Sequence, residues 1–180
     1  MTALAGAAVP LYALATAGLW LLARPFGNTR WKQACVAALG SAAVAMLVNQ
    51  AISHTWARPR PFTAHVDGTH LLAPASVDPS FPSDHAAAAF AIAFAVLAFS
   101  RRAGAGFLAA ATLIGLSRIA LGLHYPTDVL AGAVVGWASA LLVTTVGRPW
   151  VTWIVRLLGR VSDPLLAPVW RRLPHRRLAR

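Results

Sequence analysis

Five long apolar stretches constrain this chain more than any other feature of its 180 residues. They are rich in Ala, Leu, Val and Phe, and they occupy residues 2–23, 33–53, 84–100, 107–123 and 127–146. A helix needs about 20 apolar residues to cross the hydrocarbon of a bilayer. Only 12% of the residues are charged and none is Glu, whereas soluble domains carry about 25% charged residues. The sequence therefore predicts an all-α integral membrane protein, a bundle of five transmembrane helices.

The segment after the fifth stretch, residues 148–180, mixes Trp and Leu with Arg. Such a mixture is typical of an amphipathic helix that lies in the membrane interface, followed here by a basic tail. The alternative is a sixth, tilted span over residues 149–170, which would have to carry two or three charges. In either case we expect residues 1–180 to form one domain.

The basic residues indicate how the bundle is oriented. They gather in the tail and in the loops after the first and third stretches, which hold Arg24, Arg30, Lys32, Arg101 and Arg102. Because cytoplasmic loops carry such an excess, we expect a multi-pass protein of the cell membrane with its N-terminus outside and its C-terminus in the cytoplasm. The net charge of +11 does not indicate nucleic-acid binding, which needs a basic face on a soluble scaffold.

Three polar clusters interrupt the apolar chain, at residues 58–62, 81–85 and 117–128. Ionisable groups at membrane depth are expensive unless they have a partner or a function. In the predicted topology all three clusters fall at the ends of spans on the extracytoplasmic side. We therefore expect them to converge into one functional site on that side.

Part of this predicted site is suited to an anion. Arg58, Arg60 and Arg118 carry planar, permanently charged guanidinium groups that match phosphate oxygens. Ser83 follows a proline at the start of the third predicted helix, where free backbone N–H groups favour an anion. Together these residues indicate a phosphate-binding site.

Two histidines and a carboxylate supply groups for catalysis. His85 lies in the first turn of the third predicted helix, and His124 stands just before the fifth. Asp128 follows one helical turn later and could meet His124 by a hydrogen bond, which would fix the imidazole tautomer and raise its basicity. One histidine can attack phosphorus while the other protonates the leaving oxygen. The pattern therefore indicates phosphoryl transfer.

These motifs resemble the signatures of a known family, the type 2 phosphatidic acid phosphatase superfamily, which also includes the vanadium haloperoxidases. The run from Ser117 to Asp128, Ser-Arg-x5-His-x3-Asp, resembles its third signature. Residues 82–85, Pro-Ser-Asp-His, are similar to the second, which is usually Pro-Ser-Gly-His. Arg60-Pro61 resembles the end of the first, Lys-x6-Arg-Pro.

The resemblance implies a helical membrane bundle and hydrolysis through a phosphohistidine, without a metal or another cofactor. It implies His124 as the nucleophile, Asp128 as the residue that orients it, and His85 as the acid for the leaving group. The phosphate ligands that it implies are Arg60, Ser83 and Arg118.

The chain departs from the family pattern at two positions. The residue seven positions before Arg60 is not the family's Lys, so Arg58 or His54 would have to supply that charge. Asp84 stands where the family has Gly. It would either complement the dipole at the start of the helix or act beside His85.

The long connection before the third span holds further polar residues. Its His54, His65, Asp67 and His70 match no standard spacing for a metal site, so we expect no metal there and either a solvated loop or a lid over the site. Ser117, the first residue of the third motif, is a further secondary candidate for the site.

The Arg-Pro-Arg-Pro-Phe and Phe-Pro-Ser-Asp-His versions of the motifs are most similar to the undecaprenyl diphosphate phosphatases. This resemblance implies hydrolysis of the terminal phosphate of a polyprenyl diphosphate at the extracytoplasmic face, which recycles the cell-wall lipid carrier. The alternatives are a phosphatase of phosphatidic acid or phosphatidylglycerophosphate, and a non-catalytic binder of lipid phosphates. A small transporter ranks last, because the sequence shows no inverted repeat. The oligomeric state is left open.

Overall fold

The computed structural model describes residues 2–23, 25, 27, 29–64 and 78–172. These residues form helices α1 (Thr2–Leu22), α2 (Arg30–Thr55), α3 (Pro61–Ala64), α4 (Asp84–Phe99), α5 (Arg101–Ala120), α6 (Pro126–Thr145) and α7 (Arg148–Arg172). The described part of the chain contains no strand. Helices α2, α5 and α6 are long and apolar enough to cross a membrane, and α1 and α4 add shorter apolar stretches. The predicted all-α membrane bundle is confirmed.

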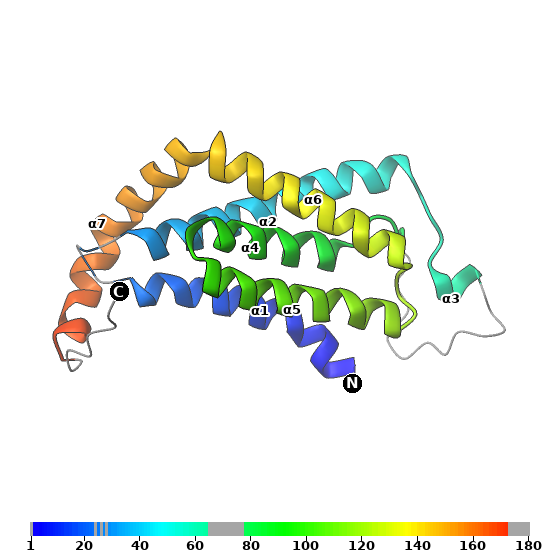
Figure 1. Ribbon diagram of the computed structural model, residues 1–180, viewed down its shortest axis with the longest axis horizontal. Coiled ribbons are helices and arrows are strands. Elements are labelled where there is room, and N and C mark those ends of the chain that lie inside the picture. The colour runs from blue at the N-terminus through cyan, green and yellow to red at the C-terminus, as the bar shows by residue number, and fades with distance from the viewer. Residues whose placement is uncertain (1, 24, 26, 28, 65–77, 173–180) are drawn as a thin grey trace.

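Helix α4 is central to the bundle, in contact with α2, α5 and α6 (Figure 1). Small side chains make this packing close, since Ala87, Ala91 and Ala95 are fully buried. In a bilayer, helices gain little from burying apolar surface against each other, so close contact between small residues supplies much of their attraction.

Two glycines of α6 bring its backbone against that of α4. A Cβ atom on Gly132 would lie 2.6 Å from the carbonyl oxygen of Ser83, and one on Gly136 would lie 2.6 Å from that of Ala87. Both distances are shorter than real Cβ atoms show, so only glycine permits this approach. As a result, the first turns of α4 and α6 lie side by side.

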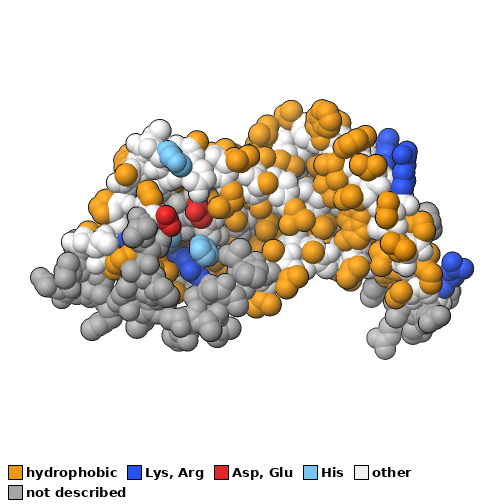
Figure 2. All heavy atoms as spheres, turned by 180° about the vertical axis from the view of Figure 1, so that it is seen from behind, with side chains coloured by type: hydrophobic (Ala, Val, Ile, Leu, Met, Phe, Trp, Pro, Cys, Tyr) orange, Lys and Arg blue, Asp and Glu red, His pale blue; other side chains and the backbone are white. Residues whose placement is uncertain are grey.

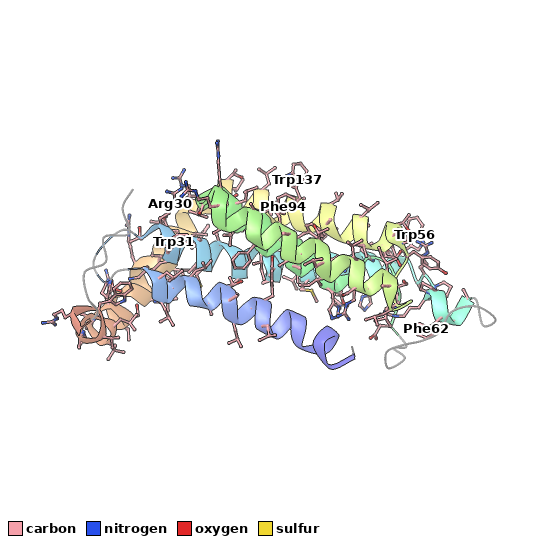
Figure 3. The ribbon with its side chains drawn as sticks, turned by 60° about the horizontal axis from the view of Figure 1, so that its bottom comes forward. Arg30, Trp31, Trp56, Phe62, Phe94 and Trp137 are labelled. Carbon is pink, nitrogen blue, oxygen red and sulfur yellow. The ribbon has the colours of Figure 1, made fainter. Side chains whose placement is uncertain are left out.

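The polar residues separate to the two ends of the bundle. Trp56 and Phe62 mark the end that holds α3, while Arg30 and Trp31 lie toward the other (Figure 3). Acidic, basic and histidine side chains gather at the first end, a broad apolar surface follows, and Lys and Arg side chains mark the second (Figure 2). Arg60 contacts His124, and Ser83 donates to Asp128, so the three polar clusters meet at one end of the bundle, as predicted.

The start of α5 corrects one predicted boundary. The helix begins at Arg101, not at residue 107, so Arg101 and Arg102 form its first turn. Ser100 causes this early start, because it adopts an extended conformation and its hydroxyl accepts a hydrogen bond from the backbone N–H of Ala103 at 3.4 Å. A boundary drawn from apolar residues alone misses such a cap.

Helix α7 leaves the end of α6 at an angle and returns toward the start of α2 (Figure 1). Its apolar and charged residues are divided between opposite faces far more clearly than those of the other long helices, so the helix is amphipathic as predicted. It extends to Arg172, the last described residue.

Lys32 is the clearest correction to the sequence analysis, which placed it in the basic loop after the first apolar stretch. It lies inside α2, is only 2% exposed, and forms an ion pair with Asp163 of α7. Its ammonium group also lies 5.3 Å from the centre of the Trp20 ring, and the Trp20 indole donates to the Ser162 hydroxyl at 3.2 Å. This cluster joins α1, α2 and α7 at the end opposite the polar clusters.

Candidate active site

The turn between α5 and α6 sets the position of His124. Gly122 has a positive φ of 71°, which ends α5. The Gly122 N–H then donates to the carbonyl of Ile119 at 2.9 Å, and that of Leu123 donates to the carbonyl of Arg118 at 3.1 Å. This pair of bonds is the Schellman motif, which reverses the chain direction. It brings His124 back toward Arg118, whose side chain is buried in the last turn of α5.

Ser83 lies where α4 begins and faces the first turn of α6. Its backbone N–H donates to the carbonyl of Asp128 at 3.0 Å. Its hydroxyl is fully buried, does not cap α4, and has no hydrogen-bond partner among the described residues. A buried hydroxyl without a partner costs about 1–3 kcal/mol. Together with the free N–H groups at the start of α4, it makes a site suited to an anion.

His124 is buried, and each of its ring nitrogens faces a different residue. Nδ1 lies 2.8 Å from the carbonyl oxygen of Ser80, and Nε2 lies 3.4 Å from Nη1 of Arg60. Burial lowers the pKa of His124 and the positive charge of Arg60 lowers it further, against the opposing effects of Ser80 and Asp128. The neutral imidazole is therefore favoured.

The predicted pairing of His124 with Asp128 needs a correction. The two side chains are neighbours, but 3.8 Å separates Nδ1 from the carboxylate oxygen Oδ2, and the hydrogen bond from Nδ1 goes to Ser80. Oδ2 instead accepts from the Ser80 hydroxyl at 2.5 Å and from the backbone N–H of Tyr125 at 2.9 Å. The sequence analysis did not consider a backbone carbonyl as the partner of the imidazole.

Arg58 contacts the same carboxylate. Its Nη1 donates to Oδ1 of Asp128 and to the Thr127 hydroxyl, both at 2.8 Å, and its guanidinium lies 4.0 Å from the centre of the Tyr125 ring. Asp128 is fully buried and Arg58 is about one-third exposed. Arg58, one of the two residues predicted to replace the missing Lys, thus directs one of its nitrogens to Asp128.

Arg60 and His85 complete the cluster. Arg60 donates from Nε to the carbonyl of Asp78 at 2.9 Å and from Nη1 to the carbonyl of Leu123 at 3.2 Å, which anchors its guanidinium beside His124. His85, in the first turn of α4, is partly buried and lies within electrostatic range of Arg118, His124 and Arg60. The two histidines and two arginines are therefore close enough for each charge to act on the others.

The secondary candidates lie at its edge or outside it. Asp84 points toward α2, where it accepts from the Asn49 amide at 2.5 Å. His54 is exposed and bonds to the carbonyl of Gln50 in its own helix, and Ser117 likewise bonds within α5. His65, Asp67 and His70 lie outside the described residues. Within the described ranges no three His, Cys, Asp or Glu side chains gather as metal ligands would.

Sequence reasoning missed two buried residues of this end. Ser80 contacts both His124 and Asp128, and Asn49 donates to Asp84 and to the carbonyl of Pro82 at 3.0 Å. Asn49 gave a usable signal, because it is an amide inside an apolar span. Ser80 gave no such signal, because serine is a common residue in a polar connecting segment.

Comparison with known protein families identifies the family of this chain. The model of the PAP2 superfamily matches residues 34–151, a range that contains every residue of the cluster. This chain belongs to the PAP2 superfamily. The predicted family is therefore confirmed.

Two of the relatives of this PAP2 chain are named as undecaprenyl-diphosphatases, one of them as a putative one. The undecaprenyl-diphosphatase BcrC of Bacillus subtilis (strain 168) is 35% identical over 161 residues, which cover 88% of this chain and 80% of that protein. The putative undecaprenyl-diphosphatase YbjG of Escherichia coli (strain K12) is 34% identical over 134 residues, 74% of this chain and 63% of that protein. A lipid A 1-phosphatase of Rhizobium etli is 40% identical over 114 residues, 60% of this chain and 47% of that protein.

One solved structure supports the PAP2 fold. The crystal structure of a transmembrane PAP2-type phosphatidylglycerolphosphate phosphatase from Bacillus subtilis matches this chain with a TM-score of 0.54 and 24% sequence identity. The match covers 78% of this chain and 69% of that one. With its apolar helices, this chain is a multi-pass membrane protein.

Proposed function

We propose that this PAP2 protein hydrolyses the terminal phosphate of a polyprenyl diphosphate, of the undecaprenyl type, through a phosphohistidine on His124. The observation that carries the proposal is the orientation of that imidazole. A carbonyl oxygen can only accept, so the contact with Ser80 requires the proton on Nδ1. Nε2 then carries the lone pair, and it faces Arg60, a guanidinium that can hold phosphate oxygens.

The reaction proceeds in two displacements. Nε2 of His124 attacks the terminal phosphorus, and the bond from that phosphorus to the bridging oxygen breaks. Protonated His85 gives its proton to the bridging oxygen, so that polyprenyl phosphate leaves. His85 then takes a proton from a water molecule whose oxygen attacks the phosphohistidine. The phosphorus–nitrogen bond breaks, and inorganic phosphate and the original imidazole are restored.

The remaining residues of the cluster stabilise charge. Arg60, Arg118, the Ser83 hydroxyl and the N–H groups at the start of α4 bind the oxygens on which negative charge spreads in the transition state. The negative diphosphate in turn favours the protonated form of His85. Arg58 uses Nη1 for Asp128, and its other N–H groups can contact an outer phosphate oxygen.

We further propose that the site faces the outside of the cell, where hydrolysis recycles the lipid carrier of cell-wall synthesis, and that the C-terminus is cytoplasmic. The support is the excess of Arg at the opposite end, which positive-inside topology assigns to the cytoplasm. Intact cells should then hydrolyse a membrane-impermeant phosphate ester as fast as permeabilised cells do. Activity that requires permeabilisation would place the site on the other face.

A panel of lipids tests the substrate. Purified protein in detergent micelles with EDTA receives undecaprenyl diphosphate, phosphatidic acid or phosphatidylglycerophosphate, and phosphate release is measured. We expect the highest kcat/KM with the polyprenyl diphosphate. A higher value for either glycerolipid would overturn the substrate assignment and leave the phosphatase assignment intact.

A His124→Ala variant separates catalysis from binding alone. If the protein only binds lipid phosphates, the parent releases no phosphate and the variant does not differ from it. If His124 is the nucleophile, the parent is active and the variant is not. Full activity in the variant would remove the nucleophile assignment.

A further inference from the structure

Ser80 lies between the nucleophile and the carboxylate that is meant to orient it. It is fully buried, its carbonyl accepts from Nδ1 of His124 at 2.8 Å, and its hydroxyl donates to Oδ2 of Asp128 at 2.5 Å. We infer that Ser80 is a positioning residue, and that Asp128 acts on His124 through it. This inference rests on the proposed function, since it concerns the same imidazole.

The carbonyl of Ser80 fixes the tautomer of His124 without help from a carboxylate. Because a carbonyl has no proton to give, Nδ1 must be the donor, whatever the charge of Asp128. The carboxylate oxygen nearest to Nδ1 is 3.8 Å away, too far for a hydrogen bond. Asp128 therefore cannot select the tautomer by direct contact in this arrangement.

What Asp128 does is hold Ser80 in place. Its Oδ2 binds the Ser80 hydroxyl, and its Oδ1 binds Nη1 of Arg58 at 2.8 Å. The backbone N–H of Ser80 donates to the carbonyl of Arg58 at 2.8 Å. These three hydrogen bonds close a ring through Arg58, Ser80 and Asp128, and the ring aims the Ser80 carbonyl at Nδ1.

The ring also explains the position of Arg58. Its guanidinium stacks on Tyr125, whose backbone N–H donates to the same carboxylate at 2.9 Å. The carboxylate thus receives donors from three residues, Arg58, Ser80 and Tyr125. A buried carboxylate held by this many donors has a fixed orientation, which is what a positioning group requires.

The test compares Ser80→Ala with the parent by kcat and by the pH dependence of kcat/KM on a polyprenyl diphosphate. Loss of the hydroxyl frees the Ser80 peptide to move, and a misplacement on the order of 1 Å lowers the rate by about 10²-fold. The freed Oδ2 can also approach Nδ1, which raises the pKa of His124. We therefore expect kcat to fall about 10²-fold, with KM little changed and the acidic limb of the profile moved to higher pH.

A double-variant cycle shows whether Ser80 and Asp128 act as a unit. If Asp128 acts through Ser80, adding Ser80→Ala to Asp128→Asn lowers kcat by less than about threefold further. The inference would be overturned if the losses of kcat in the two single variants multiply in the double variant. It would also be overturned if the acidic limb of kcat/KM lies at the same pH in Ser80→Ala as in the parent. An inactive parent would instead refute the proposed function.

Two further comparisons guard against a folding artefact. Ser41→Ala removes an equally buried serine hydroxyl from α2, and it should leave kcat unchanged without lowering the melting temperature. If Ser80→Ala does not fold, Ser80→Thr and Ser80→Val replace it, because these two side chains have similar shapes and differ in the hydroxyl. Higher activity in the threonine variant is expected, and equal activity would contradict the inference.

Discussion

Gly132→Ala tests whether the close approach of α6 to α4 builds the site. The added Cβ would lie 2.6 Å from the carbonyl oxygen of Ser83 and 3.0 Å from both the Cβ of Ala86 and the backbone nitrogen of Ala87. Ordinary van der Waals contact begins at 3.4 Å. The nearest atom is backbone and cannot rotate away, so α6 must retreat by roughly 0.8 Å or distort.

This retreat acts directly on the site. Asp128 lies one turn before Gly132, and its carbonyl accepts the Ser83 N–H at 3.0 Å. That bond stretches past hydrogen-bonding distance, and Ser83 moves relative to His124. Such a displacement lowers kcat by about 10²-fold, and the overpacking costs about 1–3 kcal/mol of stability.

The assay measures phosphate release from a polyprenyl diphosphate, together with thermal unfolding in the same detergent. Gly106→Ala is the matched control, because a Cβ there meets nothing within 4 Å and the residue lies inside α5. It should keep the activity of the parent and gain about 0.5–1 kcal/mol of stability. A Gly132→Ala protein with the kcat and melting temperature of the parent would refute the argument.

Four further results are expected. Because burial and Arg60 lower the pKa of His124, the imidazole stays neutral as the pH falls, and the acidic limb of kcat/KM should lie below the usual histidine value of about 6.5; a limb above that value would contradict this. Asp128→Asn should lower kcat by at least about 10²-fold, as Ser80→Ala does, without unfolding the protein, and parental turnover would exclude a positioning role. Lys32→Met removes the ammonium group that pairs with the buried carboxylate of Asp163 and should lower the melting temperature, whereas adding Asp163→Leu should restore part of it; equal melting temperatures of the single and double variants would contradict this. Vanadate, which resembles pentacoordinate phosphorus, should inhibit while EDTA should not, and the reverse pattern would indicate a metal.

The fold was largely predictable because its determinants are local. The length of an apolar stretch identifies a membrane helix without knowledge of its neighbours. The excess of Lys and Arg in some of the loops shows which loops lie at the same end of the bundle. The boundaries were less accurate for the same reason. The start of α5 at Arg101 depends on a cap from Ser100, and a hydropathy pattern does not detect such a cap.

Within the candidate site, the sequence identified ionisable residues that the fold brings together, but it did not identify their hydrogen-bond partners. His124 and Asp128 are set by spacing, but the bond from Nδ1 goes to a backbone carbonyl of Ser80, 44 residues away in sequence. Lys32 was misplaced because its partner, Asp163, is 131 residues away on a helix that folds back across the bundle. Neither contact leaves a trace in the local sequence.

The most direct test of the central claim is to look for phosphate on His124. Purified protein is mixed rapidly with a polyprenyl diphosphate labelled in its terminal phosphate, and the reaction is stopped with alkali, in which phosphohistidine survives. Peptide mass spectrometry should find the label on His124, it should be lost in acid, and His124→Ala should show neither label nor turnover. Turnover by the parent without phosphate on His124, or with phosphate on another residue, would contradict the account.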